Sequence, residues 1–441
     1  MVCMGSREYK APRGTRDFLP EDMILRKRVI DTISHIYELY GYSPIETPAF
    51  ESWDMLAAKC GEDMLNQIYS FEDKSGRKLG LRFDLTAPLA RVIAQNPTLP
   101  KPFKRYCISR VWRYEKQQKG RYREFWQADI DIIGTDKLSA DAEVIAIASR
   151  CLTALGFSDY IIRINNRKIL ASLVESIGIE PEKVVDVFRA MDKLDKIGNE
   201  GVRSELYERG IHSEITNRII DFLDIRGEPE YIFEVLEKQD LDIRGKEGID
   251  ELREIISYLG IYDIKGRVTV DLSLVRGLGY YTGPISEIFI PEGGVGSVSG
   301  GGRYDNLVKT YGGPDLPAVG ISLGIERLIT IIKERGMYPI EKTVTKLLVV
   351  PVHKTLIKDS VKIAEKFREL DIAVEVDLKG RKLSKNFEYA NSLGIPYVAV
   401  VGPDEIKKNK IRIKDMKTGN QIYVSMADLK TSLRDSGILL Y

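Results

Sequence analysis

Alternating apolar and polar positions predict two β-strands in the first third of the chain. The alternation runs over residues 106–112 and again over 125–133, with the period of two that a half-buried strand requires. A polar, glycine-containing stretch, 116–120, separates the two runs. Two such runs around a short polar loop predict a β-hairpin.

Charge changes sign along this hairpin. Nine of the residues in 101–123 are Lys or Arg, and Glu115 is the one acid among them. The return strand then carries Glu124, Asp129 and Asp131. A cationic loop beside carboxylates suits a polyanion together with a small zwitterion, whereas a solvated basic surface explains the same pattern without any function. The hairpin alone leaves both interpretations open.

Helical and strand periods alternate through the rest of the first 170 residues. Apolar residues recur at helical spacing over 25–40, and a proline-bounded extended segment follows up to Pro48. A strand over 78–83 leads into a helix, where Asp84 and Thr86 are either plain helix caps or groups placed to hold an ammonium. A further helix and strand are predicted over 140–156 and 160–164.

The pattern changes between residues 171 and 262. Charged helical segments follow one another there without a catalytic motif; they are predicted over 182–193, 213–223, 231–236 and 249–259. Strand periods resume at Val268, and the glycine-dense stretch 268–328 predicts short antiparallel strands closed by a helix near Gly324. We therefore predict a helical domain inserted into a sheet domain.

Strands and helices alternate after residue 346, which predicts a small α/β domain with a mostly parallel sheet. The predicted fold is thus an α+β catalytic domain on an antiparallel sheet (1–170 and 263–334), a helical insertion (171–262), a linker (335–346) and a C-terminal α/β domain (347–441). The end of the last domain is basic, which is either a solvated edge or a nucleic-acid contact; its cations are Lys407, Lys408, Lys410, Arg412, Lys414 and Lys417.

Composition narrows the class of protein. The net charge of the 441 residues is +1, so any polyanion site must be a local patch. Four widely spaced cysteines and three histidines argue against a zinc site and against a disulfide framework. The N-terminus lacks an apolar signal region, and no apolar run approaches the ~18 residues of a membrane span. We expect a soluble cytoplasmic protein without membrane contact.

Three arginines, Arg113, Arg276 and Arg327, are flanked by apolar residues and are expected to be partly buried. Buried arginine needs an anion, and several guanidinium groups can bind a triphosphate where the chain has no P-loop or dinucleotide fingerprint. Carboxylates, an amide and phenols would complete the site by holding an amino acid: Asp84, Glu115, Gln127, Asp131, Tyr280 and Tyr281. These residue types predict ATP-dependent activation of an amino-acid-like carboxylate.

The same segments resemble those of the class II aminoacyl-tRNA synthetases, and among them the histidyl-tRNA synthetases. The helix and extended segment ending at Pro48 resemble motif 1, residues 113–125 resemble motif 2 and residues 320–328 resemble motif 3. Residues 274–283 and 299–305 resemble two segments found in the histidyl enzymes. All five occur in order, and the resemblance includes a C-terminal anticodon-binding domain.

This resemblance implies a histidine–tRNA ligase that forms histidyl-adenylate and transfers histidine to the 3′ end of histidine tRNA. ATP would be a substrate with Mg²⁺ on its phosphates, no zinc would be needed, and motif 1 would build a homodimer. Arg276 and Arg113 would be catalytic. The ATP-binding residues would be Arg113, Glu115, Arg121, Phe125 and Arg327, and the histidine-binding residues Asp84, Thr86, Gln127, Asp131, Arg276, Tyr280 and Tyr281.

One residue departs from the family pattern, and two other functions remain as alternatives. Gly279 occupies a position where the family usually has Asp. That difference would suit a non-catalytic, histidine-sensing regulatory paralogue, but such paralogues typically lack both the arginine at the position of Arg276 and the C-terminal domain. A plain RNA-binding protein, the third possibility, would need neither Arg276 nor Asp131.

Overall fold

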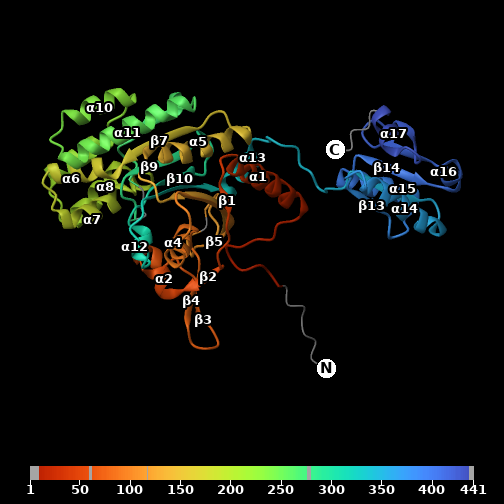
Figure 1. Cartoon of the computed structure of the whole chain (residues 1–441), viewed down its shortest axis with the longest axis horizontal. Helices are drawn as coiled ribbons and strands as arrows, with labels where there is room; N and C mark the ends of the chain where they lie inside the picture. Colours follow the sequence, from red (N-terminus) through yellow and green to blue (C-terminus); the bar gives the residue numbers. More distant parts are fainter. Residues whose placement is uncertain (1–8, 59–61, 117, 276–279, 437–441) are drawn as a thin grey trace. The chain divides into compact units, whose positions relative to one another are not determined.

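The computed structural model describes residues 9–58, 62–116, 118–275 and 280–436 (Figure 1). The chain forms two compact units, one made of Met1–Asp17 and Arg28–Tyr338 and the other of Phe18–Lys27 and Pro339–Tyr441. Among the described residues, none of the helices combines the length and the apolar composition needed to cross a membrane.

An eight-stranded sheet organises the first unit. Its five inner pairings are antiparallel, and the outermost pairing at each edge is parallel. In spatial order the strands are β1 (Ser43–Pro44), β5 (Phe103–Trp112), β6 (Glu124–Ile133), β11 (Ala318–Gly324), β10 (Ser297–Arg303), β9 (Pro284–Phe289), β7 (Ile161–Asn166) and β8 (Val268–Val270). The predicted hairpin is β5–β6, paired residue for residue from Phe103 opposite Ile133 to Trp112 opposite Glu124.

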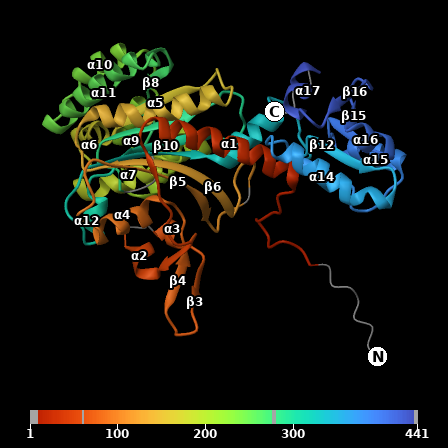
Figure 2. The same cartoon turned by 45° about the vertical axis from the view of Figure 1, so that its right-hand side comes forward.

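The two faces of this sheet differ in polarity. Ala128, Ile130 and Ile132 of β6 are buried on the face that carries helices α1 (Pro20–Leu39), α5 (Leu138–Ala154), α11 (Ile243–Ile261) and α13 (Ile325–Glu334) (Figure 2). The Tyr37 hydroxyl of α1 donates to the Ala128 carbonyl at 3.0 Å. Because side chains alternate along a strand, the polar residues of β6 lie on the opposite face.

At one end of the sheet, short elements alone cover that opposite face. Helices α4 (Thr86–Gln95) and α12 (Leu307–Thr310) pack there through a cluster that includes Leu89, Ile93 and Leu307. Next to α4 lies a small three-stranded sheet of order β2–β4–β3, which the sequence pattern predicted only in part. Its elements are β2 (Phe50–Ser52), α2 (Trp53–Ala57), α3 (Glu62–Leu65), β3 (Ser70–Glu72) and β4 (Lys78–Leu81).

The insertion is helical, as the charged periodicity predicts, and lies at one end of the large sheet (Figure 1). Its helices are α6 (Arg167–Ser176), α7 (Val184–Met191), α8 (Leu194–Glu208), α9 (Ser213–Leu223), α10 (Pro229–Glu237) and α11. The sequence pattern missed α8, where Gly198 adopts a non-helical conformation and Gly201 further weakens the helical signal. Helices α6 to α9 share an apolar core of their own.

The second unit contains a five-stranded sheet of order β13–β12–β14–β15–β16. Its elements are β12 (Leu347–Pro351), α14 (Ile357–Arg368), β13 (Val374–Val376), α15 (Leu383–Leu393), β14 (Tyr397–Val401), α16 (Pro403–Lys408), β15 (Lys410–Asp415), β16 (Gln421–Ser425) and α17 (Leu429–Asp435). The predicted α/β class is confirmed, but the sheet is mixed: two pairings are parallel and two antiparallel. The basic run near the end of the chain contains strand β15.

Candidate active site

The polar face of β6 carries four of the residues that alternate with its buried apolar ones. Phe125, Gln127, Asp129 and Asp131 lie on this face, so the strand spans about 20 Å from the aromatic ring to the last carboxylate. On the neighbouring strand β11, Gly320 lies opposite Asp131 and Ser322 opposite Asp129. A side chain at Gly320 would overlap the Asp131 carboxylate, so glycine is required there.

Asp131 is held by two buried partners. Arg105 lies directly opposite it on β5, and its Nη2 is 2.5 Å from Asp131 Oδ2, with both side chains almost fully buried. The Tyr304 hydroxyl donates a hydrogen bond to Asp131 Oδ1. Burial raises the pKa of Asp131, while Arg105 and Tyr304 act against that rise. The Arg105–Asp131 pair therefore keeps a carboxylate inside the site.

Asp129 and Asp84 add two more buried carboxyl groups near Arg105. Burial raises the pKa of Asp129 to about 7, against the opposing effect of Arg105. Burial also raises the pKa of Asp84, while its bond from the Ala87 amide and the charges of Arg113 and Arg105 lower it. Neither Asp129 Oδ1 nor Asp84 Oδ2 has a hydrogen-bond partner in the described part of the chain. Buried oxygens without partners are costly, so both are placed to accept from a ligand or water.

Asp84 is not the N-cap of α4, which is Leu85, but its side chain still binds the first turn of the helix. Asp84 Oδ1 accepts the Ala87 amide at 3.0 Å in the first turn of α4, as a capping residue would. Its other oxygen remains available to a ligand. Thr86 is the first residue of α4, is 9% exposed, and lies two residues from Asp84. One carboxylate thus contacts the start of the helix and still has a buried oxygen that can accept from a ligand.

Tyr280 and Tyr281 border the same carboxylates. Their ring centroids are 4.8 Å apart, and the Tyr280 ring lies 5.8 Å from that of Tyr304. Burial, followed by the neighbouring Tyr281 and Asp84, raises the pKa of Tyr280 well above its ordinary value. The Tyr280 phenol therefore stays protonated and can donate a hydrogen bond.

The other end of the β6 face gathers guanidinium groups. The Arg113 guanidinium lies 5.1 Å from the centroid of the Phe125 ring, and its Nε donates to the Phe83 carbonyl at 2.9 Å. Arg121 Nη1 is 3.5 Å from Glu115 Oε2 across the hairpin loop. An aromatic face flanked by forked donors is suited to a purine and its phosphates.

Arg327 completes this cationic end. It follows β11 in the first turn of α13, and its Nη1 donates to the Ser297 carbonyl of β10. Burial, and secondly the positive charge of Arg121, lower the pKa of Arg327 to about 10. Two guanidinium groups that repel each other favour an anion between them. The glycine at 120 lets the hairpin loop approach Arg327 closely.

Two family models cover most of the chain. The model described as histidyl-tRNA synthetase matches residues 14–328, and the one described as anticodon binding domain matches residues 346–436. A curated histidine–tRNA ligase of Aeropyrum pernix is 42% identical over 96% of this chain and 98% of its own length. One of Clostridium tetani is 42% identical over 94% and 95%. The chain belongs to the histidyl-tRNA synthetase family.

Solved structures of this family share the fold. The crystal structure of the histidyl-tRNA synthetase from Nostoc sp. PCC 7120 has a TM-score of 0.83 and 33% identity, and covers 97% of this chain and 99% of its own. These similarities confirm the family, the fold class and the ligase activity predicted from the sequence. The roles of individual residues and the domain boundaries stay predictions.

The sequence pattern did not identify several residues of this candidate histidyl-tRNA synthetase site. In the sequence Arg105 is one cation among nine, yet strand register places it opposite Asp131. Asp129 and Asp131 are two residues apart on one strand, so strand alternation would have placed both on one face. Tyr304 belongs to the resembling segment 299–305, but its hydrogen bond to Asp131 was not predicted, because that contact depends on the path of the chain after β10. The predicted catalytic Arg276 and the unusual Gly279 lie outside the described residues.

A contact from the N-terminus also went unpredicted. Arg16 Nη2 lies 2.5 Å from Oε2 of Glu326, the buried neighbour of Arg327, and its guanidinium is 3.8 Å from the centroid of the Tyr122 ring. The Arg123 amide donates to the Gly14 carbonyl at 3.0 Å. The segment before α1 thus connects motif 2 to motif 3.

Proposed function

We propose that the chain joins L-histidine to histidine tRNA in two steps on the polar face of β6. ATP lies at the Phe125 end and histidine at the Asp131 end, so that the histidine carboxylate meets the α-phosphate between them. The carboxylate displaces pyrophosphate, and a terminal ribose hydroxyl of the tRNA then attacks the carbonyl carbon of the adenylate, forms the ester and releases AMP. The observation that carries this proposal is the separation of charge along one strand, with guanidinium groups at one end and unpartnered carboxylate oxygens at the other.

The carboxylates of the histidine end bind the ammonium and the imidazole. Asp84, Thr86 and Gln127 surround the ammonium, and the Oε1 of Gln127 has no partner in the described part of the chain while its amide donates to Ser322 at 2.8 Å. Asp131 accepts a hydrogen bond from one imidazole nitrogen, and Tyr281 donates one to the other. Discrimination can be large without editing, because an apolar analogue would leave these buried groups unpaired.

The guanidinium groups of the ATP end bind the phosphates. Arg113 contacts the α-phosphate and Arg327 the γ-phosphate, while Phe125 stacks on adenine beside Glu115 and Arg121. Arg276 holds the histidine carboxylate and stabilises the charge that grows at the α-phosphorus. Mg²⁺ enters with the ATP phosphates as part of the substrate. The described residues contain no cluster of metal-ligating side chains of their own.

We also propose that two copies of the chain associate through α1 and the segment up to Pro48. Support comes from β1, which follows α1 and is an edge strand of the large sheet. An edge strand leaves backbone groups available to a partner.

A regulatory paralogue is the alternative function. A structure described as an ATP phosphoribosyltransferase regulatory subunit/histidyl-tRNA synthetase from Bacillus halodurans has a TM-score of 0.74 and 25% identity, and covers 86% of this chain. The ligase relatives are more similar and extend through the anticodon-binding domain. That difference favours the enzyme.

Pyrophosphate exchange into ATP, measured with each of the twenty amino acids, tests the proposal. We expect exchange with histidine alone. Arg113→Ala and Arg276→Ala should each lower it by about 10²- to 10³-fold, because each removes a donor to charge that forms in the transition state. Arg110→Ala is the matched control, since Arg110 is half exposed, pairs with Glu124 at 3.6 Å and should change little. Histidine-independent exchange, or full activity in both test variants, would contradict the assignment.

A further inference from the structure

The helical insertion contacts the segment that leads to the tyrosine pair. Val275 precedes the stretch outside the described residues, and it is 2% exposed because it packs in the core of the insertion with Val187, Phe188 and Met191. The backbone of the catalytic domain therefore enters the insertion core at Val275. By Tyr280 and Tyr281, which border the buried carboxylates, the chain is back in the catalytic domain.

Arg167 holds both sides of this segment. It is the first residue of α6, its Nη1 donates to the Val275 carbonyl at 3.1 Å, and its backbone amide donates to the Gly283 carbonyl at 3.0 Å. Its guanidinium also lies 4.3 Å from the centroid of the Phe188 ring on α7. Burial lowers the pKa of Arg167 to about 10. A cation is seldom buried without compensating groups, and here the Val275 carbonyl, the Phe188 ring and the negative charge of Asp192 compensate it.

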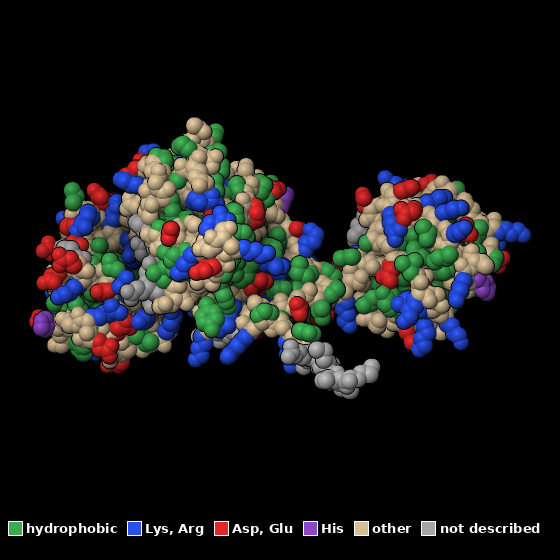
Figure 3. Space-filling view, turned by 90° about the horizontal axis from the view of Figure 1, so that it is seen from below, with side chains coloured by type: hydrophobic (Ala, Val, Ile, Leu, Met, Phe, Trp, Pro, Cys, Tyr) green, Lys and Arg blue, Asp and Glu red, His purple; other side chains and the backbone are tan. Residues whose placement is uncertain are grey.

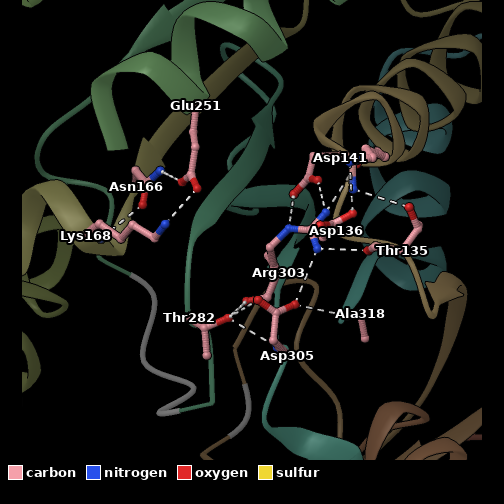
Figure 4. A network of polar contacts seen from close by, with 11 residues as sticks. Thr135, Asp136, Asp141, Asn166, Lys168, Glu251, Thr282, Arg303, Asp305 and Ala318 are labelled. Atoms are coloured by element: carbon pink, nitrogen blue, oxygen red, sulfur yellow. Dashed lines mark hydrogen bonds and ion pairs between the residues drawn. The ribbon is translucent and has the colours of Figure 1, made fainter. Parts of the chain in front are cut away.

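The residues on either side of Arg167 fix its position. Asn165 is fully buried and donates to the Leu274 carbonyl at 3.0 Å. Asn166 donates to Glu251 Oε2 at 2.7 Å, and Lys168 Nζ lies 2.7 Å from the other oxygen of Glu251, so α6 is braced against α11 (Figure 4). The junction of β7 and α6 is therefore rigid, and Arg167 extends from it toward Val275.

The far side of the segment is anchored as well. The Thr282 amide donates to the Arg303 carbonyl at 2.8 Å, and its hydroxyl lies 3.3 Å from Asp305 Oδ2. Arg303 itself is buried in an ion pair with Asp141 on α5 (Figure 4). This anchor belongs to the catalytic sheet, whereas the anchor at Val275 belongs to the insertion. Arg167 joins the two sides directly, through the carbonyls of Val275 and Gly283.

We infer that Arg167 is a positioning residue through which the insertion core places Tyr280 and Tyr281 against the histidine site. The inference rests on the proposed function of those tyrosines. Its consequence is that the insertion supports the activation of histidine, a step that takes place before any tRNA is bound. The packing of Val275 and Phe188 thereby affects the activation of the histidine carboxylate, which neither residue contacts.

The test is pyrophosphate exchange without tRNA, using the full-length chain. In Arg167→Ala we expect the KM for histidine to rise and kcat to fall, together about 10- to 100-fold in kcat/KM, because small displacements of positioned groups have effects of this size. The KM for ATP should stay within about twofold, since a contact made elsewhere leaves ground-state ATP binding unchanged. The matched control is Arg189→Ala on α7, where an exposed arginine pairs with Asp186 at 2.9 Å; it should behave like wild type.

Each outcome decides the inference. An unchanged histidine KM and kcat in Arg167→Ala would overturn it, while exchange that is absent from wild type would overturn the proposed function instead. Arg167→Lys keeps the charge over Phe188 and should recover part of the activity. If Arg167→Ala does not fold, Phe188→Leu removes the ring and leaves an apolar side chain in the core. Unaltered kinetics in a folded Phe188→Leu, with unaltered hydrogen exchange of the Arg167 amide that donates to the Gly283 carbonyl, would then overturn the inference.

Discussion

At the scale of single residues, the Arg105–Asp131 pair is the most deeply buried ion pair of the proposed histidine site. Both side chains are almost fully buried, and the two residues lie opposite each other in the β5–β6 register. Removing one member of a buried ion pair leaves the other charge uncompensated. Without Arg105, the pKa of Asp131 would rise further because burial would act on it with less opposition. Asp131 would then hold its negative charge less strongly.

We therefore expect Arg105→Met to raise the KM for histidine while leaving the KM for ATP unchanged. The free energy of unfolding should fall by about 3–5 kcal/mol. Lys104→Met is the matched control: Lys104 points to the other face of β5, where it meets Glu143 at 2.7 Å with both side chains partly exposed. It should cost no more than about 1 kcal/mol. Steady-state exchange and urea unfolding measure these effects, and an unaltered histidine KM in Arg105→Met would refute the role given to the pair.

Asp129 predicts an unusual dependence of stability on pH. Its folded-state pKa is raised to about 7, above its value in the unfolded chain, so the folded state binds the proton more tightly. Stability from this group is present at acid pH and is lost as pH rises through 7. Between pH 6 and 8 the free energy of unfolding should fall by about 1.4 kcal/mol, which corresponds to one pKa unit. Urea unfolding of the protein without ligands should show this loss, and Asp129→Asn should abolish it. Equal slopes in the two proteins would argue against the assignment.

Residue types identified much of the site from the sequence, but not how its members pair. Arg113 and Arg327 are predicted because an arginine flanked by apolar residues is costly to bury without an anion, and Asp84 and Asp131 because an ammonium needs a carboxylate. The partners themselves, such as Arg105 for Asp131, depend on which strand lies beside which and on where the N-terminus runs. Local sequence carries neither kind of information.

At the scale of elements, periodicity predicted the helices and strands that bury one face. The β5–β6 hairpin is an example, because apolar and polar residues alternate along much of both strands. Strand β10 was less visible, since three consecutive glycines leave no hydrophobic pattern to read. Glycine at 301 is explained by the backbone of β11, which a side chain would strike. Its sequence signal is therefore one of close approach rather than of a turn.

The C-terminal sheet combines strands that the sequence pattern predicted with strands that it missed. Strands β12, β13 and β14 are parallel neighbours separated by helices, and this alternation predicted them correctly. The segment after β14 continues as the antiparallel hairpin β15–β16, whose many charges masked its strand character. Ile411 and Ile413 are buried between half-exposed or exposed cations, so the period of two was present in the basic run.

At the scale of the whole molecule, charge is divided unevenly along the chain. Residues 171–262 contain 22 Asp or Glu and 12 Lys or Arg, a net charge of −10, although the whole chain is at +1. Asp and Glu side chains are prominent at the insertion end of the surface in Figure 3. The remainder of the chain therefore carries +11. A polyanion such as tRNA is attracted to the catalytic hairpin and the C-terminal unit more than to the insertion.

This charge division predicts that tRNA binding and histidine activation can be separated. Lys407, Lys408 and Lys410 are exposed at the end of α16 and the start of β15, within the residues that match the anticodon binding domain. Replacing all three by Ala should raise the KM for tRNA in aminoacylation. For each phosphate that the variant no longer binds, the slope of log binding constant against log salt should become shallower by about 0.7–0.9. Histidine-dependent pyrophosphate exchange should not change, because the β6 site lies in the other unit.

The matched control for that experiment is replacement of Lys430, Lys382 and Lys385, three lysines of the same unit away from the basic run, by Ala. This variant removes the same net charge, so a general electrostatic attraction would lower tRNA affinity equally in both proteins, whereas direct phosphate contacts would lower it mainly in the first. Equal salt dependence in the two variants would identify the basic run as a solvated edge. Lowered exchange in the first variant would instead show that the two units are coupled during activation, because its three lysines have no place in the β6 site.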